Sequence, residues 1–189
     1  MQIEGDGKNL LDSSDPFIFV SNHESYTDAI LLTALLPLRA CFAVKEGLAK
    51  NYFLAIPIRR LGHEFVERFD PSVGNREVDK LMSMLADRKS LAVFAEGTFV
   101  RSPGLQAFHM GAFSTSTRAK VPIVPIAIYG TRSLLRDEQW WFRKTPIKVT
   151  IGNLIKPRGN TWDEALRLRD ECRSEILKHC GEPEILSHY

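Results

Sequence analysis

The chain has 189 residues, 44% of them hydrophobic and 25% charged, and its 25 lysines and arginines nearly balance 23 aspartates and glutamates, for a net charge of +2. This length fits one domain with a sizeable core, and the composition excludes extensive disorder and a basic, nucleic-acid-binding surface. No stretch reaches the roughly 20 apolar residues of a membrane-spanning helix, and the polar N-terminus is unlike a secretory signal. The cysteines form no C-x-x-C pair, which favours a reduced, intracellular compartment.

Apolar, β-prone runs alternate with segments of helical spacing along the chain. The pattern predicts strands at residues 17–21, 41–44, 64–68, 90–95, 121–129 and 147–151, and helices at residues 29–36, 47–58, 75–88, 108–119 and 161–180. A capping box, Thr161 and Glu164, opens the last helix. Because proline lacks the N–H that a strand interior uses, Pro122 and Pro125 predict an edge or interrupted strand at 121–129.

This alternation predicts an α/β fold, with a mostly parallel central sheet flanked by helices. We expect a polar N-terminal lead at residues 1–16, a core at residues 17–158, and a C-terminal helix and tail at residues 159–189 that belong to the same domain. Ligands bind beyond the carboxyl ends of the strands in such sheets, so chemically active residues should follow strands.

His23 follows the first predicted strand, and Asp28 lies in the first turn of the next predicted helix. If the loop folds back, the Asp28 carboxylate can orient the imidazole and stabilise the imidazolium that forms when His23 acts as a general base. A structural alternative stays open, because Ser25 and Asp28 also have the spacing of a capping box and His23 could bond to backbone. No Gly-x-Ser-x-Gly elbow surrounds Ser25, so a serine nucleophile has no support.

Four motifs follow one another in residues 22–126: Asn22-His23-x4-Asp28, Gly62-x-x-Phe65-Val66-x-Arg68, Phe94-Ala95-Glu96-Gly97-Thr98 and the run 121–126. In this order and spacing they resemble the signature blocks of the PlsC-type glycerolipid acyltransferases, the lysophosphatidic acid acyltransferases and their relatives. Residues 108–113 are similar to the stretch between the third and fourth blocks. The resemblance implies a glycerolipid-acyltransferase-like fold and makes residues 17–158 the catalytic core.

The resemblance also implies a reaction, the transfer of a fatty acyl group from a thioester to a lysophospholipid hydroxyl. The donor would be acyl-CoA or acyl carrier protein, and the default acceptor 1-acyl-glycerol-3-phosphate, giving phosphatidic acid. In that family the histidine is the general base and the aspartate orients it, roles that carry over to His23 and Asp28. The acceptor would attack directly in a ternary complex, without an acyl-enzyme, a cofactor or a metal.

Acceptor binding would fall on Arg68 and on the turn formed by Glu96, Gly97 and Thr98, with Asn22 as a further contact. Arginine suits phosphate because its guanidinium binds two oxygens at once. Structural alternatives are a surface ion pair of Arg68 with a neighbouring glutamate and a plain strand-end turn at Glu96. For Pro122 and Pro125 we favour a purely structural role.

Two positions depart from the family pattern and put the acceptor in doubt more than the chemistry. Ala95 replaces the usual proline, and Phe99 replaces the arginine that often follows Glu-Gly-Thr. Arg101, two residues later, could supply the missing charge. Two other readings stay open: a thioester hydrolase, in which water replaces the alcohol, and a non-catalytic lipid-binding module.

Lipid substrates would require a membrane surface as a partner. Two stretches combine apolar or aromatic residues with basic ones, Leu48–Arg60 and Trp140–Lys144, as interfacial segments do. Core packing is an equally good explanation of the first stretch, and an interior or oligomer contact is the alternative for the second. We expect a cytoplasmic protein that associates peripherally with the inner face of a membrane and binds no nucleic acid.

Overall fold

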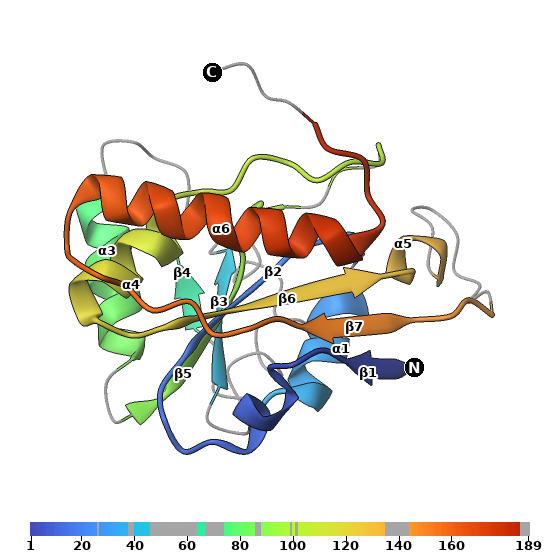
Figure 1. The fold of residues 1–189 in the computed structure, drawn as a ribbon, viewed down its shortest axis with the longest axis horizontal. Helices are drawn as coiled ribbons and strands as arrows, with labels where there is room; N and C mark the ends of the chain where they lie inside the picture. The colour runs from blue at the N-terminus through green and yellow to red at the C-terminus, as the bar shows by residue number, and fades with distance from the viewer. Residues whose placement is uncertain are drawn as a thin grey trace.

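The structure, a computed structural model, describes residues 1–25, 27–37, 40–45, 64–66, 74–85, 88–98, 100, 102–134 and 144–185. Within these ranges seven strands form one sheet in the order β1-β7-β6-β2-β5-β3-β4 (Figure 1). The strands are β1 (Gln2–Glu4), β2 (Ile18–Ser21), β3 (Ala40–Lys45), β4 (Glu64–Val66), β5 (Ser90–Phe94), β6 (Ile123–Tyr129) and β7 (Lys148–Ile151). Every neighbouring pair is parallel except β6 and β7. The predicted α/β fold with a mostly parallel sheet is confirmed.

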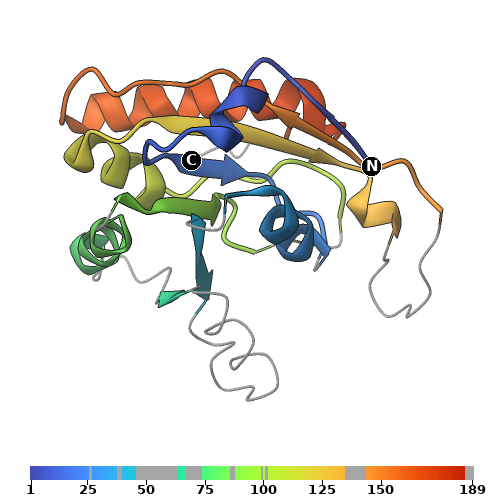
Figure 2. The ribbon, with the colours of Figure 1, turned by 90° about the horizontal axis from the view of Figure 1, so that it is seen from below.

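Helices lie on both sides of the sheet, and Figure 2 shows α6 on one side and α1 on the other. The helices are α1 (Thr27–Leu35), α3 (Gly74–Met84), α4 (Gly111–Ala119), the short α5 (Thr131–Leu134) and α6 (Trp162–Cys180), with a 3-10 turn, η1, at Lys8–Asp12. Alternate side chains of the strands lie on opposite faces of the sheet and pack in two separate hydrophobic clusters. One cluster includes Leu81, Phe113 and Leu168 of α3, α4 and α6, and the other includes Leu32 of α1.

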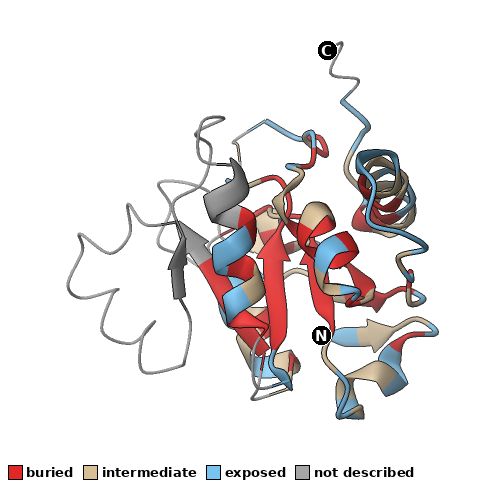
Figure 3. Ribbon diagram, turned by 90° about the vertical axis from the view of Figure 1, so that its left-hand side faces the viewer, coloured by how far each residue is buried: buried red, intermediate tan, exposed pale blue. Residues whose placement is uncertain are grey.

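The central strands β2 and β5 are buried along their whole length (Figure 3). A parallel strand covered on both faces is expected to be continuously apolar, and the runs at 18–20 and 91–94 satisfy this expectation. The register pairs Ser21 of β2 with Phe94 of β5, so both strands end at the same level. The loops that leave them therefore start side by side at the middle of the sheet.

Most of the predicted elements are present, with some changes at their ends. The helix predicted at 108–119 begins at Gly111, and the predicted capping box is half formed, since the Thr161 side chain accepts from the Glu164 backbone N–H while the Glu164 carboxylate accepts from the N–H of Arg158. The helix predicted at 47–58 lies outside the described residues. In the polar lead, where no element was predicted, β1 pairs with β7 and joins the sheet.

The prediction of an edge strand at 121–129 is wrong, since β6 lies between β7 and β2, but its alternative, an interrupted strand, holds on the β7 side, where the pairing breaks at Pro125. Pro125 is accommodated because the pairing shifts on the β7 side, where Ile126 faces Ile151 but Ile123 faces Ile155. Three residues, 152–154, thus lie opposite two, 124 and 125, which is a bulge. Proline is tolerated at a bulge, where the ladder is already interrupted.

Candidate active site

The loop that leaves β2 places His23 and Asp28 together. Nδ1 of His23 lies 3.0 Å from Oδ2 of Asp28, which is fully buried in the first turn of α1. The same oxygen accepts the backbone N–H groups of Glu24, at 2.6 Å, and Ser25, at 2.8 Å. The carboxylate thus caps the helix and holds the imidazole at once, so the structural and chemical alternatives from the sequence are both present.

The imidazole of His23 is fixed on a second side by an aromatic ring. It stacks on Phe94 of β5, with ring centroids 4.0 Å apart and an interplanar angle of 14°, and the His23 side chain is 15% exposed. A carboxylate partner favours the tautomer with the proton on Nδ1, because that nitrogen then donates. Nε2 is then the ring atom with a lone pair, which is the arrangement a general base requires.

Glu96 lies two residues beyond β5, as His23 lies two residues beyond β2. Its Oε1 accepts the backbone N–H of His23 at 2.7 Å, and its Oε2 accepts that of Gln106 at 2.8 Å. Burial raises the pKa of Glu96 to about 7, against these two hydrogen bonds, which lower it. Both oxygens therefore anchor loops of the protein itself, whereas the sequence had assigned Glu96 to the turn that binds the acceptor.

The turn after Glu96 needs glycine. Gly97 has φ of +74°, in the left-handed region that side chains with a Cβ rarely adopt, and its N–H donates to the Phe94 carbonyl. Thr98 follows on the surface of this turn. The turn thus brings a backbone segment and Thr98 to the outer edge of the site.

Asn22 was expected to contact the substrate, but it is buried and binds the protein backbone instead. Its side chain is fully buried, and its amide exchanges two hydrogen bonds with the backbone of Ile128, at 2.8 and 2.9 Å. The amide nitrogen also donates to Oε1 of Glu24 at 2.9 Å. Because these bonds use both the oxygen and the nitrogen of the amide, Asn22 ties β2 to β6 and supports the His23 loop from behind.

Glu24 is a site residue that was not predicted from the sequence, although its position directly after His23 indicates that it lies close to the site. It is 6% exposed, and burial, followed by the negative charges of Glu182 and Asp28, raises its pKa to about 8. Glu24 lines a cavity of about 240 Å³ together with Tyr129, Arg132 and Glu182. This cavity lies next to the His23 loop, at the carboxyl end of β6.

The raised pKa of Glu24 predicts a pH-dependent stability. The unfolded chain loses this proton near pH 4.5, but the folded protein keeps it to about pH 8, so the free energy of unfolding falls as pH rises between these values. Glu24→Gln imitates the protonated form and keeps an oxygen for Asn22. We expect urea denaturation to show Glu24→Gln more stable than wild type at pH 8, by about 2–4 kcal/mol, with a smaller difference at pH 5.

The matched control for this prediction is Glu171→Gln on α6, where the side chain is half exposed and pairs with Arg167. This variant should follow the wild-type pH dependence within about 0.5 kcal/mol, as surface substitutions usually do. Parallel wild-type and Glu24→Gln curves from pH 5 to 8 would show that Glu24 ionises normally in the folded protein.

The structure thus brings five of the predicted site residues to one end of the sheet: Asn22, His23, Asp28, Glu96 and Gly97, with Thr98 at the surface. Arg68 and Arg101 lie outside the described residues, as do Leu48–Arg60 and all of Trp140–Lys144 except its last residue. Among the described helices, none combines the length and the apolar character needed to cross a bilayer.

Fold and site together define an α/β protein with a histidine–carboxylate pair in the loop beyond a central strand. Comparison with protein families shows the family to which this chain belongs, since the model of the Acyltransferase family matches residues 2–129. The chain belongs to this acyltransferase family, and the resemblance to PlsC-type proteins seen in the motifs is confirmed.

Several similar proteins are named 1-acyl-sn-glycerol-3-phosphate acyltransferases. The chain is 27% identical over 166 residues to the 1-acyl-sn-glycerol-3-phosphate acyltransferase of Haemophilus influenzae, covering 87% of this chain and 68% of that protein. It is 25% identical over 165 residues to the protein of that name from Saccharomyces cerevisiae, covering 86% and 54%. The chain therefore spans about half the length of the yeast relative, and 58% of a Caenorhabditis elegans relative, acl-2.

A solved structure shows the same fold. The 1-acyl-sn-glycerophosphate acyltransferase PlsC from Thermotoga maritima superimposes with a TM-score of 0.71 at 22% sequence identity, over 94% of this chain and 71% of that one. The overall arrangement of strands and helices is thus shared with that protein.

Proposed function

We propose that the protein is an O-acyltransferase that moves a fatty acyl group from a thioester to the free hydroxyl of a lysophospholipid, with 1-acyl-sn-glycerol-3-phosphate as the first candidate acceptor. The observation that carries the proposal is the His23–Asp28 pair, 3.0 Å apart beyond β2, in a chain of the acyltransferase family. The relatives' names support this acceptor. The donor is an acyl thioester of coenzyme A or of acyl carrier protein.

In the proposed mechanism His23 moves one proton. Nε2 of His23 takes the proton from the acceptor hydroxyl while the hydroxyl oxygen attacks the carbonyl carbon of the thioester. The tetrahedral oxyanion then collapses, the carbon–sulfur bond breaks, and the thiolate takes the proton back from the imidazolium. Asp28 holds Nδ1–H throughout and offsets the positive charge that His23 carries in between. Since the acceptor oxygen attacks the thioester itself, the chain forms no acyl-enzyme.

The acceptor headgroup is assigned to the turn that follows β5. Gly97 and Thr98 offer a backbone segment and a hydroxyl there, and Arg68 and Arg101, assigned from the sequence alone, would provide the charge that a phosphate needs. Contact with a membrane surface, which a lipid acceptor requires, is assigned on the same basis to Trp140–Lys144.

Thiol release separates this proposal from its alternatives. The purified protein is given an acyl-CoA with and without 1-acyl-glycerol-3-phosphate, and free thiol and lipid product are measured. We expect release that depends on the acceptor and equals the phosphatidic acid formed. Release without an acceptor would identify a thioester hydrolase, in which water replaces the hydroxyl. No release with any lysophospholipid and either donor would favour a lipid-binding module.

A further inference from the structure

The chain segment that follows α6 lies against the loop that follows β5. Helix α6 ends at Cys180, Gly181 turns the chain with φ of +72°, and residues 182–185 then run beside residues 102–106. Leu105 donates its backbone N–H to the Pro183 carbonyl at 2.9 Å, and Leu105 and Glu184 form a parallel bridge. Figure 1 shows the two segments near each other above the sheet. We name residues 182–185 the C-terminal tail, and the described residues 97, 98, 100 and 102–106 the acceptor loop.

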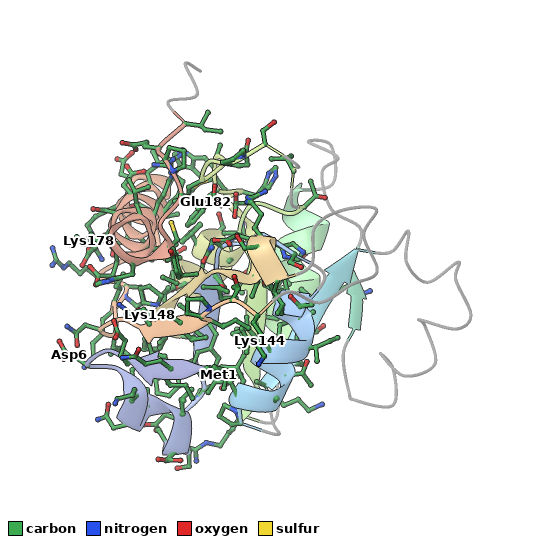
Figure 4. All side chains as sticks on the ribbon, turned by 90° about the vertical axis from the view of Figure 1, so that its right-hand side faces the viewer. Met1, Asp6, Lys144, Lys148, Lys178 and Glu182 are labelled. Carbon is green, nitrogen blue, oxygen red and sulfur yellow. The ribbon has the colours of Figure 1, made fainter. Side chains whose placement is uncertain are left out.

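Glu182 connects the C-terminal tail both to the acceptor loop and to Arg132 of α5. It is the second residue beyond the end of α6 (Figure 4), and its side chain is only 9% exposed. One carboxylate oxygen accepts the backbone N–H of Gly104, and the other accepts Nε of Arg132 at 2.7 Å. Arg132 in turn donates from a terminal nitrogen to the Val100 carbonyl at 2.7 Å. The pair therefore binds the acceptor loop at two points four residues apart.

The acceptor loop is fixed at its other end by the candidate active site. Gln106 donates its backbone N–H to Glu96, whose second oxygen accepts the N–H of His23. Hydrogen bonds thus link the C-terminal tail, through Gly104, Gln106 and Glu96, to the backbone N–H of His23. Charge-assisted bonds of this kind are stronger and more directional than neutral ones, so they suit the fixing of a loop.

We propose that Glu182 and Arg132 form a positioning pair that holds the acceptor loop in the conformation that receives the lysophospholipid. The inference rests on the proposed function, because it assigns acceptor binding to Gly97 and Thr98 at the start of this loop. Neither residue of the pair takes part in proton transfer. Its loss should therefore weaken acceptor binding much more than turnover or donor binding.

The test is Glu182→Gln, which keeps the size of the side chain but gives it one acceptor oxygen where two are used. We expect the KM for 1-acyl-glycerol-3-phosphate to rise about tenfold, the effect of losing one charge-assisted hydrogen bond. The kcat and the KM for acyl-CoA should change less than about threefold. Arg132→Lys retains the charge but not the two directed bonds to Glu182 and to the Val100 carbonyl, so it should also raise the KM for 1-acyl-glycerol-3-phosphate.

Hydrogen exchange gives a second readout that needs no activity. The backbone amides of residues 104–106 should exchange faster in Glu182→Gln than in wild type, while those of β2 and β5 stay unchanged. The matched control is Glu175→Gln on α6, which breaks an exposed pair with Lys178 and should alter neither readout. Unchanged exchange at 104–106, or an unchanged acceptor KM in an active protein, would overturn the proposal. A wild type without transferase activity would contradict the proposed function, and exchange alone would then decide whether the pair holds the loop.

Discussion

His23→Ala is expected to lower kcat for acyl transfer by about 10²–10⁴-fold, the usual contribution of a positioned general base. Alanine removes Nε2, so the acceptor hydroxyl must lose its proton to water. The loop itself should stay in place, because its anchors do not use the ring: the His23 backbone N–H donates to Glu96, and Asp28 still accepts from Glu24 and Ser25. The measurement is steady-state kinetics with saturating acyl-CoA and acceptor.

A suitable control is His179→Ala, which removes a partly exposed histidine on α6 that pairs with Glu175. This variant should retain wild-type turnover. Circular dichroism and urea denaturation on both variants separate a chemical defect from unfolding. Wild-type kcat in a folded His23→Ala protein would refute the assignment of the general base.

The second large effect is expected for Asp28→Asn, with a fall in kcat of roughly 10³–10⁴-fold, as for the same change in a serine-protease triad. An asparagine oxygen at the position of Oδ2 can still accept from His23, Glu24 and Ser25, but it no longer carries the charge that offsets the imidazolium. Its NH₂ group would replace Oδ1, which is buried without a hydrogen-bond partner among the described residues. We expect about 1–3 kcal/mol lower stability from this unpaired donor.

The control for helix capping is Asp163→Asn, an exposed acid in the first turn of α6. It should leave kcat unchanged, because it removes only a favourable charge at a helix start. Since His23 and Asp28 act as one unit, the double variant His23→Ala/Asp28→Asn should be no slower than His23→Ala alone. Near-normal turnover in Asp28→Asn would show that Asp28 caps the helix and nothing more, whereas a further loss in the folded double variant would show that Asp28 acts independently of His23.

The sequence was sufficient to predict the fold class and the contact between His23 and Asp28, because both depend on local patterns. Buried strands are continuous apolar runs, and the two residues are five positions apart at a strand–helix junction. The bonds of Asn22 to Ile128 could not be predicted, because they join positions 106 residues apart and depend on β2 and β6 being neighbours. Periodicity identifies strands but does not give their order.

The same limit applies to Glu96 and Glu182. A carboxylate after a strand suggests a ligand contact, but both oxygens of Glu96 are bound by backbone N–H groups that only the assembled loops bring near. The position of Pro125 in an interior strand could not be predicted for a related reason. Its effect on the strand depends on the bulge opposite it, which arises from the pairing with β7 and not from residues near the proline.

The hydrogen bonds of Asn22 have a consequence for how the main chain can leave a sheet. The side-chain amide gives Ile128 a donor and an acceptor, the two groups that the backbone of a longer β2 would supply there. The ladder between β2 and β6 is therefore extended by a side chain, while the backbone after Ser21 has already turned away. The chain can thus form the tight loop around Asp28 without leaving the backbone N–H and C=O of Ile128 unpaired in the centre of the sheet, where an unpaired peptide group is costly.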